Sequence, residues 1–332
     1  MHPKLIRSGC SLLCAALLLS SCGDSVAIHT PTAIVATPYP TATRLALPTH
    51  IPLNSPIPQG DQLFLSDYDT GIIARVDLST QETTVIVTGL SKPEDGTCNA
   101  KGQIFFAETS SGRILRFNAD GGDQTTILDS SQRTPEGQQF TPEGPSFDTS
   151  GNLFFNTAGA EFDVYPHSGA YRIIGGDPGN KPERIILPFT QHGEGTVFLP
   201  TGEFLVTDWT GGRIIESVPP RFGFGRVFAS GIRHPLGIAS RSDGDVFVSE
   251  GDESESSLTG DIFHLDSKGN LLGVFKTLDA VPRHMEFDAD DNLYVGTITG
   301  GVFKITPKGL TTRIAKGRHV SGLAICKVSK GH

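Results

Sequence analysis

The sequence predicts an all-β protein, a six-bladed β-propeller whose last strand completes the first blade. Five segments align without gaps, each opening with Pro or Gly and ending in an apolar strand: residues 93–106, 142–155, 193–206, 235–248 and 282–295. Their starts lie 49, 51, 42 and 47 residues apart, and repeats of this length with four short strands each are typical of propeller blades. The abundance of Gly (39) and Pro (22) also favours short strands joined by tight turns.

The first blade is predicted from two distant pieces of the chain. Residues 62–65, 72–76 and 84–87 form three apolar strands with no inner strand, whereas residues 320–326 are an inner-strand sequence with no blade. Pairing the two pieces closes the ring and leaves no exposed edge. The propeller then spans residues 60–332, which gives about 45 residues for each of six blades.

The first 59 residues are predicted to be an export signal and a tether. A basic start followed by a short apolar run over residues 1–21 is typical of a secretory signal peptide. The tetrad Leu19-Ser20-Ser21-Cys22 resembles a bacterial lipobox, which implies cleavage before Cys22 and a lipid on its thiol; a plain signal peptide is the alternative. Residues 22–59 are rich in Thr and Pro and cannot form a core. We therefore expect an exported protein, anchored to the bacterial membrane through Cys22.

Composition and charge exclude several classes of protein. With 37% hydrophobic and 19% charged residues, the chain is neither a polytopic membrane protein nor wholly disordered. Its net charge of −9 lacks the basic field that attracts a phosphate backbone. We expect a monomer that takes a small-molecule substrate or an envelope ligand and binds no nucleic acid.

Two cysteines remain in the predicted propeller. The repeat register places Cys98 and Cys326 on neighbouring inner strands, at offsets that differ by one residue. This difference predicts two buried free thiols rather than a disulfide.

Strand order predicts a binding surface at one end of the propeller, which we call the mouth. The start of each inner strand, the end of each second strand and the loops between second and third strands share this end. The two longest of these loops, residues 158–169 and 251–260, lie there, as does the polar connection 129–141. Insertions gathered at one end of a rigid scaffold are typical of a binding site.

Acidic residues are predicted to converge at the mouth. The second residue of each inner strand, read around the ring, is Ser321, Glu94, Glu143, Glu194, Leu236 and Arg283. Three consecutive carboxylates repel one another unless a cation or protons intervene. Glu94, Glu143 and Glu194 are therefore candidate ligands of a divalent metal, with Ca²⁺ preferred and Mg²⁺, Mn²⁺ or Zn²⁺ as alternatives. The other interpretation is that Arg283 neutralises one glutamate while water and backbone amides satisfy the rest.

Histidines surround these acids. His192, His234 and His319 each precede an inner strand, and His284 lies inside the sixth one. Such side chains can serve as general bases or ligands, or can be turn residues with backbone partners. As candidate catalytic residues the sequence offers Arg283, His192 and His234.

A second acidic ring ends the second strands, and a structural role is preferred for it. Glu108 and Asp208 each precede an arginine by five residues across a Gly-bearing turn, which predicts the ion pairs Glu108–Arg113 and Asp208–Arg213.

The segment 142–155, which begins Pro-Glu-Gly-Pro, resembles the senescence-marker-protein/gluconolactonase/luciferin-regenerating-enzyme family of six-bladed propellers. That resemblance implies a divalent metal ligated by Glu143 and hydrolysis of lactones. Glu94 and Glu194 occupy equivalent strand positions but are Glu where the family has Asn or Asp. Leu236 and Arg283 stand where a further ligand or the acidic base is expected. Generic propeller repeats of the NHL and streptogramin-lyase type share part of the same pattern.

Three functions follow as hypotheses. The first is an envelope-anchored, metal-dependent hydrolase of lactone or ester type, in which Arg283 orients an oxyanion and His192 or His234 carries protons. The second is a non-catalytic propeller that binds a ligand or protein. The third is an Mg²⁺-dependent lyase that uses a histidine at the mouth.

Overall fold

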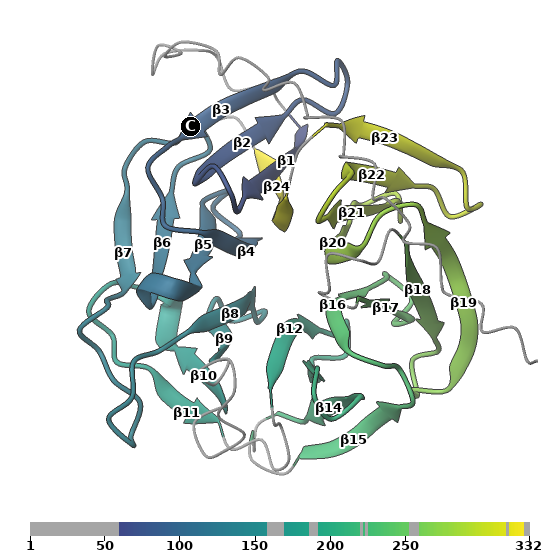
Figure 1. Cartoon of the computed structure of the whole chain (residues 1–332). Coiled ribbons are helices and arrows are strands. Elements are labelled where there is room, and N and C mark those ends of the chain that lie inside the picture. The colour runs from purple at the N-terminus through teal and green to yellow at the C-terminus, as the bar shows by residue number, and fades with distance from the viewer. Residues whose placement is uncertain are drawn as a thin grey trace, which may run out of the picture. The chain divides into compact units, whose positions relative to one another are not determined.

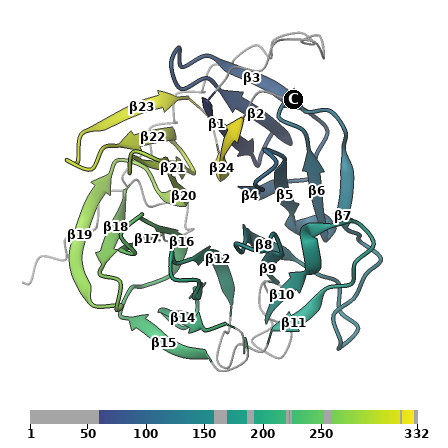
Figure 2. The same cartoon turned by 180° about the vertical axis from the view of Figure 1, so that it is seen from behind.

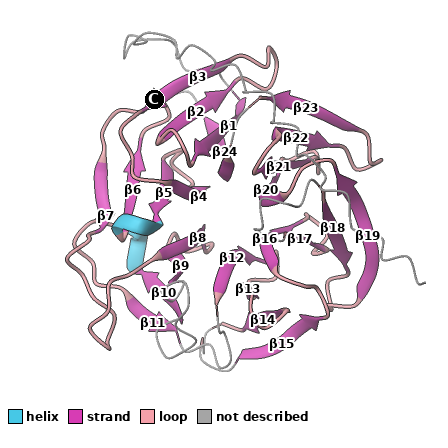
Figure 3. Cartoon of the chain, viewed as in Figure 1, coloured by secondary structure: helices cyan, strands magenta, loops and turns pink. Residues whose placement is uncertain are grey.

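A computed structural model describes residues 60–157, 169–185, 192–219, 222, 225–251, 259–316 and 319–328. These residues form six antiparallel four-stranded sheets around a central axis, the predicted six-bladed β-propeller (Figure 1). Besides strands and loops the described chain contains two short 3-10 helices, η1 (Thr109–Ser111) and η2 (Ile174–Gly176) (Figure 3). No helix in these ranges is long and apolar enough to cross a bilayer. Cys22, the predicted signal and tether, and most of the two long mouth loops lie outside the described residues.

Each blade runs from an inner strand at the axis to an outer strand. Blade 1 comprises β24 (Val320–Val328), β1 (Gly60–Asp67), β2 (Ile72–Val76) and β3 (Thr83–Val87). Blade 2 comprises β4 (Pro93–Cys98), β5 (Ile104–Glu108), β6 (Arg113–Phe117) and β7 (Thr125–Leu128). Blade 3 comprises β8 (Pro142–Phe147), β9 (Leu153–Thr157), β10 (Gly169–Ile173) and β11 (Glu183–Ile185). Blade 4 comprises β12 (Gly193–Phe198), β13 (Phe204–Asp208), β14 (Arg213–Ser217) and β15 (Gly225–Ser230). Blade 5 comprises β16 (Pro235–Ser240), β17 (Val246–Glu250), β18 (Gly260–Leu265) and β19 (Leu271–Leu278). Blade 6 comprises β20 (Pro282–Phe287), β21 (Leu293–Thr297), β22 (Gly301–Ile305) and β23 (Thr311–Ala315).

The C-terminal strand closes the ring, as predicted. β24 pairs antiparallel with β1 from Gly60↔Val328 to Asp67↔Val320, so the first blade contains both ends of the propeller sequence. Seen from behind, β24 again lies between β1 and the axis (Figure 2). Both edges of β1 are therefore paired, which removes a template for aggregation.

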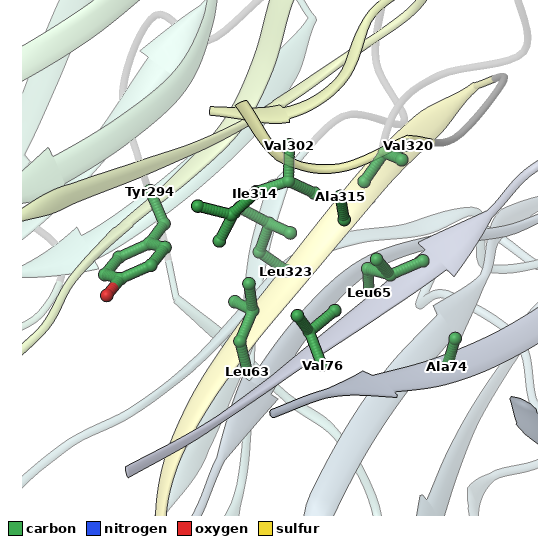
Figure 4. Close-up of a cluster of buried hydrophobic side chains, with 10 residues drawn as sticks. All are labelled: Leu63, Leu65, Ala74, Val76, Tyr294, Val302, Ile314, Ala315, Val320 and Leu323. Atoms are coloured by element: carbon green, nitrogen blue, oxygen red, sulfur yellow. The ribbon is translucent and has the colours of Figure 1, made fainter. Parts of the chain in front are cut away.

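The apolar core lies between the blades. Six clusters of buried side chains are present, one at each interface between neighbouring blades. The cluster between blades 6 and 1 joins Tyr294 and Val302 to Leu63 and Leu323 (Figure 4). Full burial of a side chain such as Leu63 contributes about 1.5–3 kcal/mol. Alternate residues of the strands thus hold the blades face to face.

Adjacent inner strands are displaced by one residue along the axis. We call the second residue of each inner strand ring position 1 and the third residue ring position 2. A Cβ at Gly322, in ring position 2, would lie 2.0 Å from the carbonyl oxygen of Glu94, in ring position 1 of the next blade. A Cβ at Gly237 would lie equally close, at 2.0 Å, to the carbonyl oxygen of Arg283. Glycine is therefore required at residues 322 and 237, where ring position 2 packs on the next strand.

The prediction of free thiols is wrong, because this displacement brings the two cysteines together. Cys98 and Cys326 form a disulfide with a Cα–Cα distance of 5.5 Å. Since Gly322 lies beside Glu94, Cys326 four residues further along lies beside Cys98. A difference of one residue in offset is what pairing between neighbouring blades requires. The disulfide therefore ties the C-terminal strand of blade 1 to blade 2.

Both predicted ion pairs at the ends of second strands are confirmed. The Arg113 Nε–H donates to Glu108 Oε2 at 2.6 Å, and Arg213 Nε lies 2.9 Å from Asp208 Oδ2. Both carboxylates are fully buried, so each requires its cationic partner.

Replacing Cys98 by Ser is expected to lower the free energy of unfolding by about 2–5 kcal/mol, because the disulfide closes a 228-residue separation in the unfolded chain. Equilibrium denaturation in urea, with and without reductant, measures the change. Cys326→Ser should give the same loss, and the double variant no more than either single one. An unchanged midpoint in all three variants would show that the disulfide has no role in stability.

Candidate functional site

Three buried carboxylates converge at the mouth. Glu94, Glu143 and Glu194 occupy ring position 1 of three consecutive blades, on β4, β8 and β12, and expose 8%, 6% and 7% of their surface. The inner strands of these blades pack directly against one another. The structure thus places the three predicted glutamates at one level of the channel.

Two of these glutamates form a cluster with His192. One donor atom from each of Glu143, Glu194 and His192 lies within 4.8 Å of the others. His192 Nε2 is 2.8 Å from Glu194 Oε1, whereas the buried Glu143 Oε2 has no hydrogen-bond partner among the described residues. We call this cluster the carboxylate–histidine triad. Two carboxylates and one imidazole form a donor set that divalent cations use.

The buried ion pair of blade 4 positions His192. Asp208, held by Arg213, accepts a hydrogen bond from the backbone N–H of His192 at 3.1 Å. The backbone N–H of Trp209 donates to the carbonyl oxygen of His192 at 2.8 Å. The chain entering β12 is therefore fixed by the end of β13.

The two carboxyl groups of the triad have opposite pKa shifts. Burial raises the pKa of Glu143 well above its usual range, and the nearby charges of Glu194 and Glu94 raise it further. Burial also acts to raise the pKa of Glu194, but the hydrogen bond from His192 and the charge of Arg283 outweigh it, so that the pKa of Glu194 is lowered. The raised pKa of Glu143 favours its protonated form where no cation is bound, and the lowered pKa of Glu194 favours its ionised form. A cation would displace that proton.

Glu94 lies beside Arg283 rather than in the triad. Arg283 Nη2 is 3.3 Å from Glu94 Oε2, with 11% of each side chain exposed. Burial raises the pKa of Glu94 to about 7, and the charge of Arg283 opposes the rise without cancelling it. The alternative interpretation of the sequence was that Arg283 neutralises one of the glutamates. The structure shows this contact between Arg283 and Glu94, at the same mouth as the triad.

An ion pair across the channel was missed by the sequence analysis. Asp95 and His284 occupy ring position 2 in blades 2 and 6, and His284 Nδ1 lies 2.9 Å from Asp95 Oδ1. Burial opposes protonation, but the charge of Asp95 raises the pKa of His284 to about 9. Ring position 2 is Gly in the other four blades. Asp95 and His284 are therefore the two exceptions to a repeated glycine, and this departure from the repeat is the sequence signal that could have predicted the pair.

The remaining histidines lie at the rim with aromatic partners. His234 stacks on Trp209 with ring centroids 4.3 Å apart, and His192 lies 5.5 Å from the same indole. Across the mouth His319 packs on Tyr68 at 4.7 Å. His234 is therefore held against Trp209, with its Nδ1 buried and without a hydrogen-bond partner. Trp209 is the single tryptophan of the chain, which makes its fluorescence a reporter of this site.

The arrangement offers three distinct chemical features within one opening. The triad can hold a divalent cation, Glu94 provides a carboxyl group with a pKa of about 7, and Arg283 provides a fixed positive charge. A carboxyl group with a pKa near neutrality suits proton transfer.

Comparison with known proteins identifies the fold. No family model matches the sequence, and no curated protein matches it. Similar solved structures include a nidogen/laminin complex (17% identity, 80% of this chain and 98% of that chain, TM-score 0.63). They also include a streptogramin B lyase (14% identity, 79% and 83% coverage, TM-score 0.56) and a provisionally assigned gluconolactonase (17% identity, 79% and 90% coverage, TM-score 0.54). At these identities the likeness establishes the propeller fold alone.

Replacing Glu94 by Gln is expected to reduce the pH dependence of stability in metal-free protein. Because the folded-state pKa of Glu94 is raised from 4.5 to about 7, its contribution is full below about pH 4.5 and is lost as the pH rises through 7. Between pH 5 and 8 the wild type should lose about 3 kcal/mol more than Glu94→Gln. Denaturant unfolding in EDTA measures this, with the exposed carboxyl variant Glu82→Gln as the control. Parallel pH profiles for wild type and Glu94→Gln would contradict the assignment.

Proposed function

We propose that the protein is a metal-dependent hydrolase of lactones or related esters, with its active site at the mouth. The carboxylate–histidine triad carries this proposal, because Glu143 Oε2 is a buried carboxyl oxygen with no partner, adjacent to two further donor atoms. An orphaned buried acceptor is costly unless a bound group satisfies it. The likeness to a provisionally assigned gluconolactonase supports the proposal at the level of fold.

The residues around the triad suit ester hydrolysis. A divalent cation bound by Glu143, Glu194 and His192 would supply Lewis-acid polarisation of the substrate carbonyl. Arg283 would present its guanidinium to the developing oxyanion, the role that the sequence-based hypothesis gives it. Glu94, in contact with Arg283 and with a pKa of about 7, would accept a proton from the attacking water and donate it to the leaving alkoxide oxygen. This differs from the sequence-based hypothesis, since His192 serves as a ligand and His234 is held against Trp209.

The donor set also bears on the metal. Three glutamates alone favour Ca²⁺, whereas an imidazole in place of one carboxylate favours Zn²⁺ or another transition ion. We therefore propose a divalent cation for which Zn²⁺ is the first candidate, ahead of Ca²⁺, Mg²⁺ and Mn²⁺.

Export and lipid anchoring through Cys22 are part of the proposal. The Cys98–Cys326 disulfide supports them, because structural disulfides persist in oxidising compartments outside the cytosol. The substrate is then a small molecule that reaches the envelope.

Metal analysis of the purified protein tests the triad directly. We expect one divalent ion per chain and a lower melting temperature after treatment with EDTA. Glu143→Gln should lose the ion, whereas Glu250→Gln, a matched change at the end of β17, should retain it. Emission of Trp209 should change when metal is restored to the wild type and stay constant in Glu143→Gln, since the indole lies 5.5 Å from His192.

Activity distinguishes the three hypotheses. A screen of aliphatic and sugar lactones with the metal-loaded protein should show turnover that falls at least about 100-fold in Glu143→Gln, the size of effect expected for loss of an electrostatic catalyst. Undiminished turnover in that variant would overturn the proposal. Metal binding with ligand affinity but no turnover would favour the binding propeller, and an unsaturated product would favour the lyase.

A further inference from the structure

A cavity lies far from the mouth, at the opposite end of the propeller between blades 2 and 3. Its volume is about 260 Å³, and every residue that lines it is described. The lining comes from the turn between β4 and β5, from the end of β8 and from the turn that follows β10. In Figure 1 blades 2 and 3 lie next to each other, with β5 and β6 facing β8 and β9. The cavity plays no part in the site described above.

Arg116 distinguishes this cavity from the other blade interfaces. In every blade a charged residue or a histidine of the third strand pairs in register with an aromatic or leucine residue of the second strand: Arg75, Arg116, Arg172, Glu216, His264 and Lys304. These six residues occupy the same place in the repeat. Their surroundings can therefore be compared directly.

Three of the six form an ion pair, a fourth, His264, contacts a carboxylate, and a fifth lies near two carboxylates. The contacts are Arg172–Glu183 at 2.6 Å, Glu216–Arg226, His264–Asp245 at 2.7 Å and Lys304–Asp288 at 3.9 Å. Burial lowers the pKa of Arg75, and the charges of Asp120 and Asp77 oppose that effect. A partly buried charge at this place thus has an opposite charge nearby.

Arg116 is the exception. Its Nη2 donates to Thr125 Oγ1 at 3.1 Å, and within the described chain no carboxylate reaches ion-pair distance. Its Nε is buried without a partner, as is the Nε of Arg172, but Arg172 has Glu183 as an ion-pair partner. Lys101 and Asp177 are the other charged residues of the lining, so two cations face one anion. The cavity is therefore electropositive in a chain whose net charge is −9.

The floor of the cavity is aromatic. Phe105 and Phe147 pack edge to face with centroids 4.8 Å apart, and both line the cavity. A guanidinium beside apolar rings suits a ligand that has a carboxylate at one end and a flat apolar body. The volume lies below the range of about 300–1,000 Å³ that is typical of drug-sized ligands, so the ligand is small.

We propose that this cavity is a binding site for a small organic carboxylate, whose anionic group pairs with Arg116 and Lys101 and whose body packs on Phe105 and Phe147. The ligand supplies the opposite charge that the other blades provide from their own side chains. Because strand ends place the cavity at the opposite end of the propeller from Trp209, binding is independent of the metal and of the proposed hydrolysis.

Benzoate is a suitable probe, with benzamide as its uncharged counterpart and inorganic phosphate as an anion without an apolar body. Calorimetric titration and melting curves of the full chain, in EDTA at constant ionic strength, should show saturable binding and stabilisation by benzoate only. Arg116→Gln should weaken binding by at least about tenfold, as expected for loss of a charge-assisted hydrogen bond. Arg172→Gln, the equivalent position in the next blade, should leave binding unchanged.

A second variant guards against a folding defect in Arg116→Gln. Lys101 is exposed, so Lys101→Gln should fold normally and still weaken benzoate binding. Emission of Trp209 should not respond to benzoate, which separates this site from the mouth. Equal binding of benzamide or phosphate, no binding of benzoate, or unchanged affinity in both variants would overturn the proposal.

Discussion

The close approach of six inner strands around a narrow axis, each displaced by one residue from the next, is the constraint on which the rest of the structure depends. At Gly322 and Gly237, ring position 2 packs on the carbonyl of ring position 1 in the next blade, so a side chain there would collide with that carbonyl. The same displacement sets Cys326 opposite Cys98. The one-residue displacement therefore determines both how the ring is closed and where glycine must stand next to its axis.

The candidate site follows from the same crowding. Side chains at ring position 1 point to a space that three carboxylates must share, and burial makes their mutual repulsion strong. Protonation of Glu143, the Arg283–Glu94 contact and the bond from His192 to Glu194 relieve it without a cation. A divalent ion would relieve it more fully, which is the physical basis for proposing a metal at the triad rather than a purely structural cluster.

Much of this could be predicted from residues alone. The spacing of the repeats predicted the blades, and the orphan strand 320–326 predicted how the ring closes, because an unpaired inner strand and an incomplete blade require each other. The ion pairs Glu108–Arg113 and Asp208–Arg213 were also predictable, since a five-residue spacing across a tight turn brings the two ends together. Spacing along the chain, both between the repeats and within a single blade, was sufficient for these inferences.

What the sequence by itself determined was therefore the fold, the closing strand and the ring of glutamates, since each depends on periodicity along one chain. The disulfide, the different partners of Glu94 and Glu143, and the Asp95–His284 contact were decided only by the tertiary structure. Each of these depends on how neighbouring or facing blades are displaced relative to one another. That displacement arises from packing around the axis, and no spacing within a single repeat encodes it.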